Sequence, residues 1–292
     1  MPLAADACDP RDPRDRPDRL DPASREREYS PSSAIGGNYA PFLAQYAALS
    51  ARAHARLPAQ RDLRYGAAPR ATLDYFPARA DARRPGLLIY IHGGYWQEGT
   101  KDHSAFLAPA WHDAGMAHAV VGYTLAPEAR LPQIVAECRT ALAWLVARAD
   151  TLGFDAANVV VAGSSAGGYL TAASADRSPV PVRGIVPVSG VFDVAPLIGT
   201  SVNDPLGLDA ATAAALDLLT PERRYCPAVV AWGEVETGAF KQQSRAFATA
   251  LRNAGTSCTS LEVPGRNHFD VILELGDAAS PLFAAALGLF AR

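Results

Sequence analysis

The chain has 292 residues, of which 49% are hydrophobic, and its formal net charge is −3. This length fits one large α/β domain or two smaller ones, and the apolar content is ample for a sizeable core. No block of Lys and Arg is dense enough to follow a phosphate backbone, so the charge pattern argues against a nucleic-acid-binding protein.

The N-terminal residues 1–28 alternate charges and prolines and offer little apolar surface to bury. Such a segment cannot offset the entropy that ordering costs, so we expect a disordered tail. Two alternatives are that it lies upstream of the natural start site and that it wraps around a partner. Residues 29–292 are expected to form a single domain.

The periodicity along this domain changes from helical to strand-like and back several times. A helical spacing over Tyr39–Leu57 is followed by Leu63–Gly66 and Thr72–Phe76, which we expect to form an opening antiparallel pair. Near-continuous apolar runs then predict parallel strands buried on both faces, at Leu87–His92, Ala117–Tyr123, Val159–Ala162, Val182–Val188, Ala228–Trp232 and Thr259–Val263. Helical segments alternate with them at Leu131–Asp150, Ala166–Ala175, Phe240–Ala254 and Ser280–Phe290. This alternation predicts a doubly wound α/β sheet.

The segment Asp193–Arg224 is less regular than its surroundings and lies between two predicted strands. We expect it to form a small cap over the site.

A short motif stands where a predicted strand passes into a predicted helix. The run Val159–Leu170, written VVVAGSSAGGYL, places Gly163, Ser165 and Gly167 in a G-x-S-x-G pattern. In a nucleophile elbow the central serine occupies a strained turn that exposes its hydroxyl. A strand–helix junction that simply requires small residues is the alternative interpretation.

A serine hydroxyl is a weak nucleophile and needs a base, which in turn needs an orienting acid. In the order typical of α/β-hydrolases both follow the serine. Five of the six histidines precede Ser165, and only His268 follows it, in a turn-rich loop after the last predicted strand. His268 is therefore the candidate base.

The acid is expected in the loop after the strand Pro227–Trp232, where Glu234 and Glu236 both stand. A carboxylate there fixes the tautomer of the imidazole and stabilises the imidazolium. Asp193 and Asp204 also follow the serine but belong to the irregular segment. From the residues alone, either glutamate fits.

A second motif, His92-Gly93-Gly94-Tyr95-Trp96, ends another predicted strand. Without a Cβ, the N–H groups of Gly93 and Gly94 can approach a substrate oxygen and join the N–H of Ala166 in an oxyanion hole. His92 itself is expected only to brace the loop.

These motifs together resemble the α/β-hydrolase kynurenine formamidases (arylformamidases), neighbours of the hormone-sensitive-lipase-like esterases. The likeness runs from about Tyr39 to the end of the chain and rests on HGGYWQEGTKDHSAF, GSSAGG, ETGAFKQQS and Asn267-His268-Phe269. It implies Ser165 as nucleophile, His268 as base and Glu236 as acid. Many relatives carry Asp at the position of Glu236, and a Glu-Phe pair found in relatives is replaced here by Ala239-Phe240, so Glu234 stays an alternative.

The resemblance also implies an activity, which is hydrolysis of N-formyl-L-kynurenine to formate and the free amine through a formyl-enzyme, without metal or organic cofactor. A small molecule is then the partner, and a homodimer is left open. We expect Tyr95 and Trp96 to contact the substrate, and an aromatic pocket could further include Phe192, Trp232 and Phe269.

Two other functions remain to be compared with this one. A carboxylesterase for small acyl or aryl esters would use the same motifs, because pocket shape is not written in them. A hydrolase-fold protein that binds without catalysis would lack a triad member, whereas all three positions are filled here.

Several features of the sequence argue against secretion, membrane insertion and a bound metal. Four cysteines, Cys8, Cys138, Cys226 and Cys258, lie far apart and form no C-x-x-C pair or Cys/His cluster, so we expect reduced thiols and no metal. There is no apolar run of about 18 residues that could span a bilayer and no signal-peptide pattern. We expect a soluble, cytoplasmic protein with no membrane partner.

Overall fold

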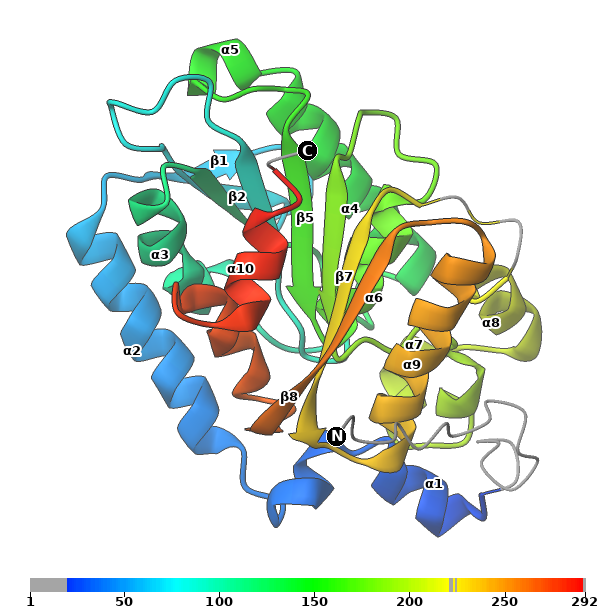
Figure 1. Ribbon diagram of the computed structural model, residues 1–292. Helices are drawn as coiled ribbons and strands as arrows, with labels where there is room; N and C mark the ends of the chain where they lie inside the picture. Colours follow the sequence, from blue (N-terminus) through cyan, green and yellow to red (C-terminus); the bar gives the residue numbers. More distant parts are fainter. Residues whose placement is uncertain (1–19, 221–222, 224, 291–292) are drawn as a thin grey trace.

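A twisted sheet forms the centre of the molecule (Figure 1). The computed structural model describes residues 20–220, 223 and 225–290. Its 8-stranded sheet has the order β1-β2-β4-β3-β5-β6-β7-β8, with β2 antiparallel to both its neighbours and the remaining pairs parallel. The strands are β1 (Gln60–Arg64), β2 (Thr72–Phe76), β3 (Leu87–Ile91), β4 (Ala117–Val121), β5 (Val159–Ser164), β6 (Gly184–Val188), β7 (Ala228–Val235) and β8 (Cys258–Asn267).

The apolar runs of the sequence form the buried strands of this sheet. Every residue of β3, β4 and β6 is buried, because helices cover both faces and leave no side for polar groups. Side chains alternate between two apolar clusters, so that Leu87 and Ile89 face one and Leu88 and Tyr90 face the other. The predicted α/β architecture with a mostly parallel sheet is confirmed.

Two sets of helices supply these covers (Figure 1). One cluster packs under α4 (Leu131–Val146), α6 (Ala166–Ala175) and α9 (Gly238–Asn253), and the other under α2 (Ala40–Arg56), α3 (Ala108–Asp113) and α10 (Pro281–Leu287). Shorter helices are α5 (Ala149–Leu152), η3 (Lys101–His103), η4 (Ala105–Leu107) and η6 (Val271–Gly276). Within the described ranges, none of the helices combines the length and the apolar content needed to cross a bilayer.

The expected cap segment, residues 193–224, contains three short helices within its described part. They are η5 (Ala195–Leu197), α7 (Asn203–Leu206) and α8 (Ala210–Leu216). Ser201 and Val202 of this segment border the main cavity, so the segment contributes to its wall.

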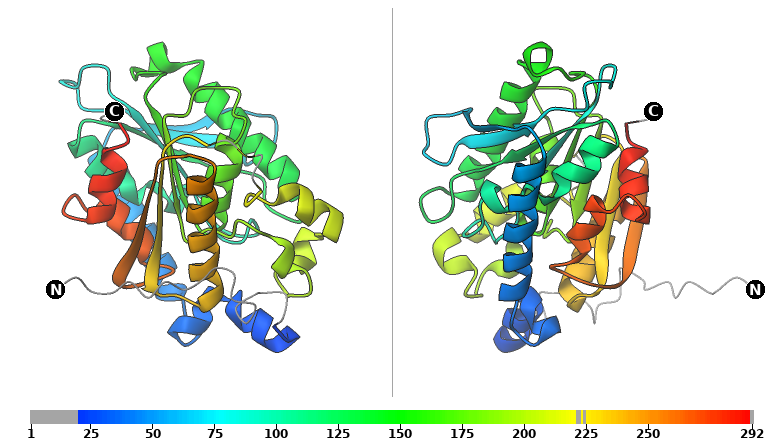
Figure 2. Two further views of the ribbon diagram at one scale, coloured as in Figure 1. Left: turned by 45° about the vertical axis from the view of Figure 1, so that its right-hand side comes forward. Right: turned by 90° about the vertical axis from the view of Figure 1, so that its left-hand side faces the viewer.

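The expected tail boundary at residue 28 is wrong. Residues 22–28 form α1 (Pro22–Glu28), with Asp21 as its N-cap, and η2 (Pro31–Ile35) follows. Figure 2 shows this dark-blue segment against the end of the sheet where the parallel strands finish. It is ordered through polar contacts to distant parts of the chain, which a local count of apolar residues does not register. Residues 1–19 of the predicted tail lie outside the described part of the chain.

Candidate active site

Ser165 occupies the turn between β5 and α6. Its backbone angles, φ 56° and ψ −123°, lie in a region that a residue with a side chain rarely adopts. A Cβ on Gly163 would lie 2.3 Å from the carbonyl oxygen of Gly167, and one on Gly167 would lie 2.1 Å from that of Ile91. Both glycines are required because strand, turn and helix meet backbone to backbone. The turn has the strained geometry expected of a nucleophile elbow.

His268 and Glu236 meet beside this turn. His268 follows β8 directly, Glu236 follows β7 directly, and the distance from His268 Nδ1 to Glu236 Oε2 is 2.9 Å. Their side chains are 4% and 0% exposed, so no water competes for the contact. A carboxylate only accepts hydrogen bonds, so Nδ1 carries the proton and Nε2 is left free to accept one.

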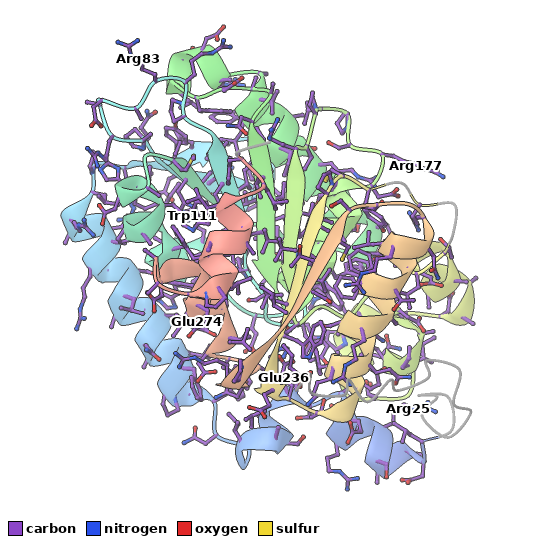
Figure 3. The ribbon with its side chains drawn as sticks, in the orientation of Figure 1. Arg25, Arg83, Trp111, Arg177, Glu236 and Glu274 are labelled. Atoms are coloured by element: carbon purple, nitrogen blue, oxygen red, sulfur yellow. The ribbon has the colours of Figure 1, made fainter. Side chains whose placement is uncertain are left out.

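The carboxylate of Glu236 is also held from its other side. Oε1 accepts a hydrogen bond of 2.6 Å from Ser189 Oγ and one of 2.5 Å from the N–H of Gly233. With His268 this makes three donors, which fix the orientation of the carboxylate. Figure 3 labels Glu236 at the end of β7.

The alternative acid, Glu234, points elsewhere. It is exposed, and its Oε2 accepts a hydrogen bond of 2.8 Å from the N–H of Gly265. The register of β7 against β8 shifts between Gly233 and Val235. Because of this irregularity, the side chains of Glu234 and Glu236 point in different directions. Of the two candidates, Glu236 is the one that contacts His268.

The Gly-Gly loop after β3 lies against the elbow. A Cβ on Gly93 would lie 3.2 Å from the Cβ of Ser165, and Gly94 has φ 105°, where a Cβ would lie 2.3 Å from the carbonyl oxygen of Glu98. Among the described residues, no protein acceptor takes the N–H groups of Gly93, Gly94 or Ala166. Unpaired N–H groups beside a serine are what an oxyanion hole requires.

His92 supports this loop. Its Nδ1–H donates to the carbonyl oxygen of Gly93 at 2.8 Å, and its ring stacks on Tyr123 with 4.3 Å between centroids. Burial lowers the pKa of His92 to about 4, so the ring is neutral at pH 7. The expectation that His92 braces the loop agrees with these contacts.

A cavity of about 560 Å³ opens above the elbow, and Ser165 and His268 both line it. No hydrogen bond joins Ser165 Oγ to His268; in unliganded sites this bond is often long and tightens only when substrate binds. Within the described ranges, no group of His, Cys, Asp and Glu side chains is arranged to hold a metal ion.

Two of the predicted aromatic residues line this cavity. Tyr95 has φ 46° and directs its hydroxyl to the carbonyl oxygen of Tyr29, and Phe269 follows His268 directly. Tyr39 stacks on Phe269 with 5.2 Å between ring centroids. Aromatic side chains therefore form part of the cavity wall.

The expectation that Trp96 contacts substrate is wrong. Trp96 also has positive φ, and its fully buried side chain packs edge-on against Tyr169 in the core. Phe192 stacks on Phe247, and Trp232 lies under Arg245, so neither reaches the cavity.

Sequence reasoning missed several tyrosines that line the cavity, namely Tyr29, Tyr39, Tyr46 and Tyr90. Tyr90 is the fourth residue of β3, and its hydroxyl is 3.0 Å from Ser164 Oγ. Its place two residues before His92 could have indicated a position near the site. Tyr29 offered no such signal, because it lies just after the polar N-terminal segment.

Two protein-family models match parts of the chain. One, described as BD-FAE, matches residues 73–179, and the other, the prolyl oligopeptidase family, matches residues 133–273. Neither match includes residues 22–32. A solved structure described as a candidate thioesterase from Silicibacter superposes with a TM-score of 0.80 at 29% identity, covering 90% of this chain and 98% of that one. This likeness agrees with the α/β-hydrolase fold.

Curated relatives narrow the assignment. A kynurenine formamidase from Danio rerio is 31% identical over 230 residues, which is 74% of this chain and 76% of that protein. An ethyl acetate hydrolase from Pseudomonas putida is 37% identical over 105 residues, which is 35% of this chain and 33% of that protein. This serine hydrolase of the α/β-hydrolase fold belongs to the kynurenine formamidase family.

Proposed function

We propose that this enzyme hydrolyses aryl formamides such as N-formyl-L-kynurenine, releasing formate and the free aryl amine. The observation that carries the proposal is the 2.9 Å contact between His268 and Glu236 beside a cavity that also holds Ser165. The substrate class comes from the kynurenine formamidase relative.

In the proposed first step Ser165 Oγ attacks the formyl carbon, and its proton passes to Nε2 of His268. The carbonyl oxygen becomes an oxyanion, which accepts hydrogen bonds from the N–H groups of Gly93, Gly94 and Ala166. The C–N bond then breaks, and His268 returns the proton to the departing amine nitrogen. Glu236 stabilises the imidazolium while it exists.

In the second step the same histidine takes a proton from water, whose oxygen attacks the formyl-enzyme. The ester bond to Ser165 breaks, the proton returns to Oγ, and formate leaves. No cofactor is needed, because acid, base and nucleophile are all supplied by the chain.

Kinetics on matched substrates test the substrate class. We expect kcat/KM for N-formyl-L-kynurenine to exceed that for its N-acetyl analogue, which differs by one methyl group, by at least about tenfold. It should also exceed kcat/KM for 4-nitrophenyl acetate. A formamide constant no better than the ester constant would sink this assignment.

A formamide kcat/KM no better than the ester kcat/KM would favour a carboxylesterase for small esters. The similarity to the Pseudomonas putida enzyme, whose name states ester hydrolysis, supports this second candidate. The triad chemistry would be unchanged, since only the leaving group differs.

A further inference from the structure

The N-terminal segment that the sequence predicted to be a tail takes part in building the site. We define residues 25–32 as the strap. Glu26, Tyr29, Ser30, Pro31 and Ser32 of the strap line the same cavity as Ser165 and His268. The strap therefore forms one wall of the site, although it lies more than a hundred residues from either side chain in sequence.

The strap is anchored at its start to the cap segment. The Arg25 guanidinium donates to the carbonyl oxygen of Ile198 at 3.3 Å, and the Glu26 carboxylate accepts from the N–H of Ser201 at 2.8 Å and from its hydroxyl. Figure 3 labels Arg25 on α1. These contacts hold α1 beside the cavity.

Glu28 then reaches the loop that carries the triad acid. Its Oε2 accepts a hydrogen bond of 3.0 Å from the N–H of Ala239, in the first turn of α9. The N-cap residue of α9, Thr237, makes no side-chain cap of its own, and its hydroxyl donates to the carbonyl oxygen of Glu28 at 2.6 Å. A carboxylate from α1 thus replaces the local cap of this helix. Glu236, the triad acid, is the residue directly before Thr237.

Tyr29 continues the connection towards the base and the Gly-Gly loop. It is fully buried, its carbonyl oxygen accepts a hydrogen bond from the Tyr95 hydroxyl, and its own hydroxyl accepts one from Gln243 Nε2. Its ring lies 6.3 Å from Phe240, whose ring packs at 4.4 Å against His268. Tyr29 is therefore held between the Gly-Gly loop and α9, and it reaches His268 through the ring of Phe240.

We propose that Glu28 is a positioning residue for catalysis, acting through Thr237 and Ala239 to hold Glu236 against His268. Without the Glu28 carboxylate, the N–H of Ala239 loses its acceptor, and the bond from the Thr237 hydroxyl to the backbone carbonyl of Glu28 is left to tie this turn to α1. The backbone from which Glu236 reaches the imidazole is then held less firmly. The inference goes beyond the proposed function, because it concerns how the triad is held and is the same for a formamide or an ester.

The test compares three variants. Glu28→Ala removes the capping acceptor, and Glu28→Gln keeps an acceptor oxygen in the same place. Asp209→Ala removes a carboxylate cap of the same type, 2.7 Å from the N–H of Thr212 on α8, where no site residue follows. It controls for the loss of a helix cap as such.

We expect Glu28→Ala to lower kcat by about tenfold or more with little change in KM, since small displacements of a catalytic group have large effects on rate. Glu28→Gln should recover kcat to within about threefold of the original enzyme, and Asp209→Ala should leave kcat unchanged. A Glu28→Ala enzyme with the kcat of Asp209→Ala would overturn the inference, as would a Glu28→Gln enzyme no better than Glu28→Ala.

A second measurement distinguishes the positioning role from misfolding of the variant and from a wrong choice of substrate. The rate at which a fluorophosphonate labels Ser165 reports the state of the triad without any assumed substrate, and near-ultraviolet circular dichroism checks the fold. We expect the labelling rates to follow the same order as kcat. Equal labelling rates in folded Glu28→Ala and Asp209→Ala would contradict the positioning role, whereas a failure of the formamide assignment would appear in the unsubstituted enzyme.

Discussion

Replacing Glu236 with Gln changes one oxygen to an NH2 group and should disable His268. In the structure Oε1 of Glu236 accepts from two donors, Ser189 Oγ and the N–H of Gly233. An NH2 group there would face the backbone N–H, so the amide must keep its oxygen on that side. Its NH2 then points at Nδ1 of His268, which must lose its proton to accept. The proton moves to Nε2, and the base can no longer accept one from Ser165.

The expected loss is large because the base is held in the wrong tautomer. The same change of tautomer in a serine protease triad lowers kcat by about 10⁴-fold, and a factor of this size corresponds to about 5 kcal/mol of activation free energy. Steady-state kinetics on N-formyl-L-kynurenine and on 4-nitrophenyl acetate should both show it, with KM little changed.

Glu234→Gln is the matched control. Glu234 is exposed, and its carboxylate accepts a hydrogen bond from the N–H of Gly265, which an amide oxygen can also accept. We expect kcat to change by less than about twofold. If Glu234→Gln were the more damaging of the two, or if Glu236→Gln kept most of its activity, the assignment of the acid would be refuted.

Three further predictions concern the loop, the core and pH. Gly94→Ala should lower kcat by about 10²-fold or more, because a Cβ there would lie 2.3 Å from a carbonyl oxygen and must displace the loop; kinetics on the folded variant would show this, and full activity would contradict it. Lys101→Met should lower the unfolding free energy in urea by about 3 kcal/mol, because it removes the 2.8 Å partner of the fully buried Asp74 carboxylate. Arg56→Met, at an exposed ion pair, should have almost no effect, and equal losses in the two variants would refute the reasoning. Burial holds the pKa of His92 at about 4, whereas the unfolded chain has about 6.5. The unfolded state therefore binds the extra proton first as pH falls, and stability that is present above pH ~6.5 is lost towards pH ~4. His92→Asn should reduce the slope of stability against pH in this window by about 1.4 kcal/mol per pH unit, and an unchanged slope would contradict the burial argument.

The parallel sheet could be predicted because each of its strands can be recognised from its own short run of residues. Runs such as Leu87–Ile91 and Val159–Ser164 are apolar at nearly every position, which only a strand covered on both faces can accommodate. The predicted strand Thr259–Val263 was found, and it extends to Asn267 because β7 continues beside it. The length of an edge strand depends on its neighbour, which a single run does not reveal.

The strap could not be predicted, because the contacts that hold it against the rest of the domain are long-range. Glu28 contacts residues more than 200 positions away, and Tyr29 is buried by side chains from α9 and from the Gly-Gly loop. A polar, proline-rich composition is typical of disorder when the chain is considered locally.

The site residues divide in the same way. Chain order and the motif identified Ser165 and His268, and the family resemblance favoured Glu236 while leaving Glu234 open. The register shift of β7 against β8, which no local pattern indicates, places Glu236 beside His268. Trp96 was misplaced because positive φ at two consecutive residues turns its ring into the core.

The most direct test of the central claim is covalent trapping of the nucleophile. The intact enzyme is treated with a fluorophosphonate, digested, and mapped by mass spectrometry, with Ser165→Ala treated in parallel. We expect a single adduct on Ser165, together with loss of all hydrolysis, and no adduct in the variant. Label on another residue, or turnover of N-formyl-L-kynurenine that persists in Ser165→Ala, would contradict the account.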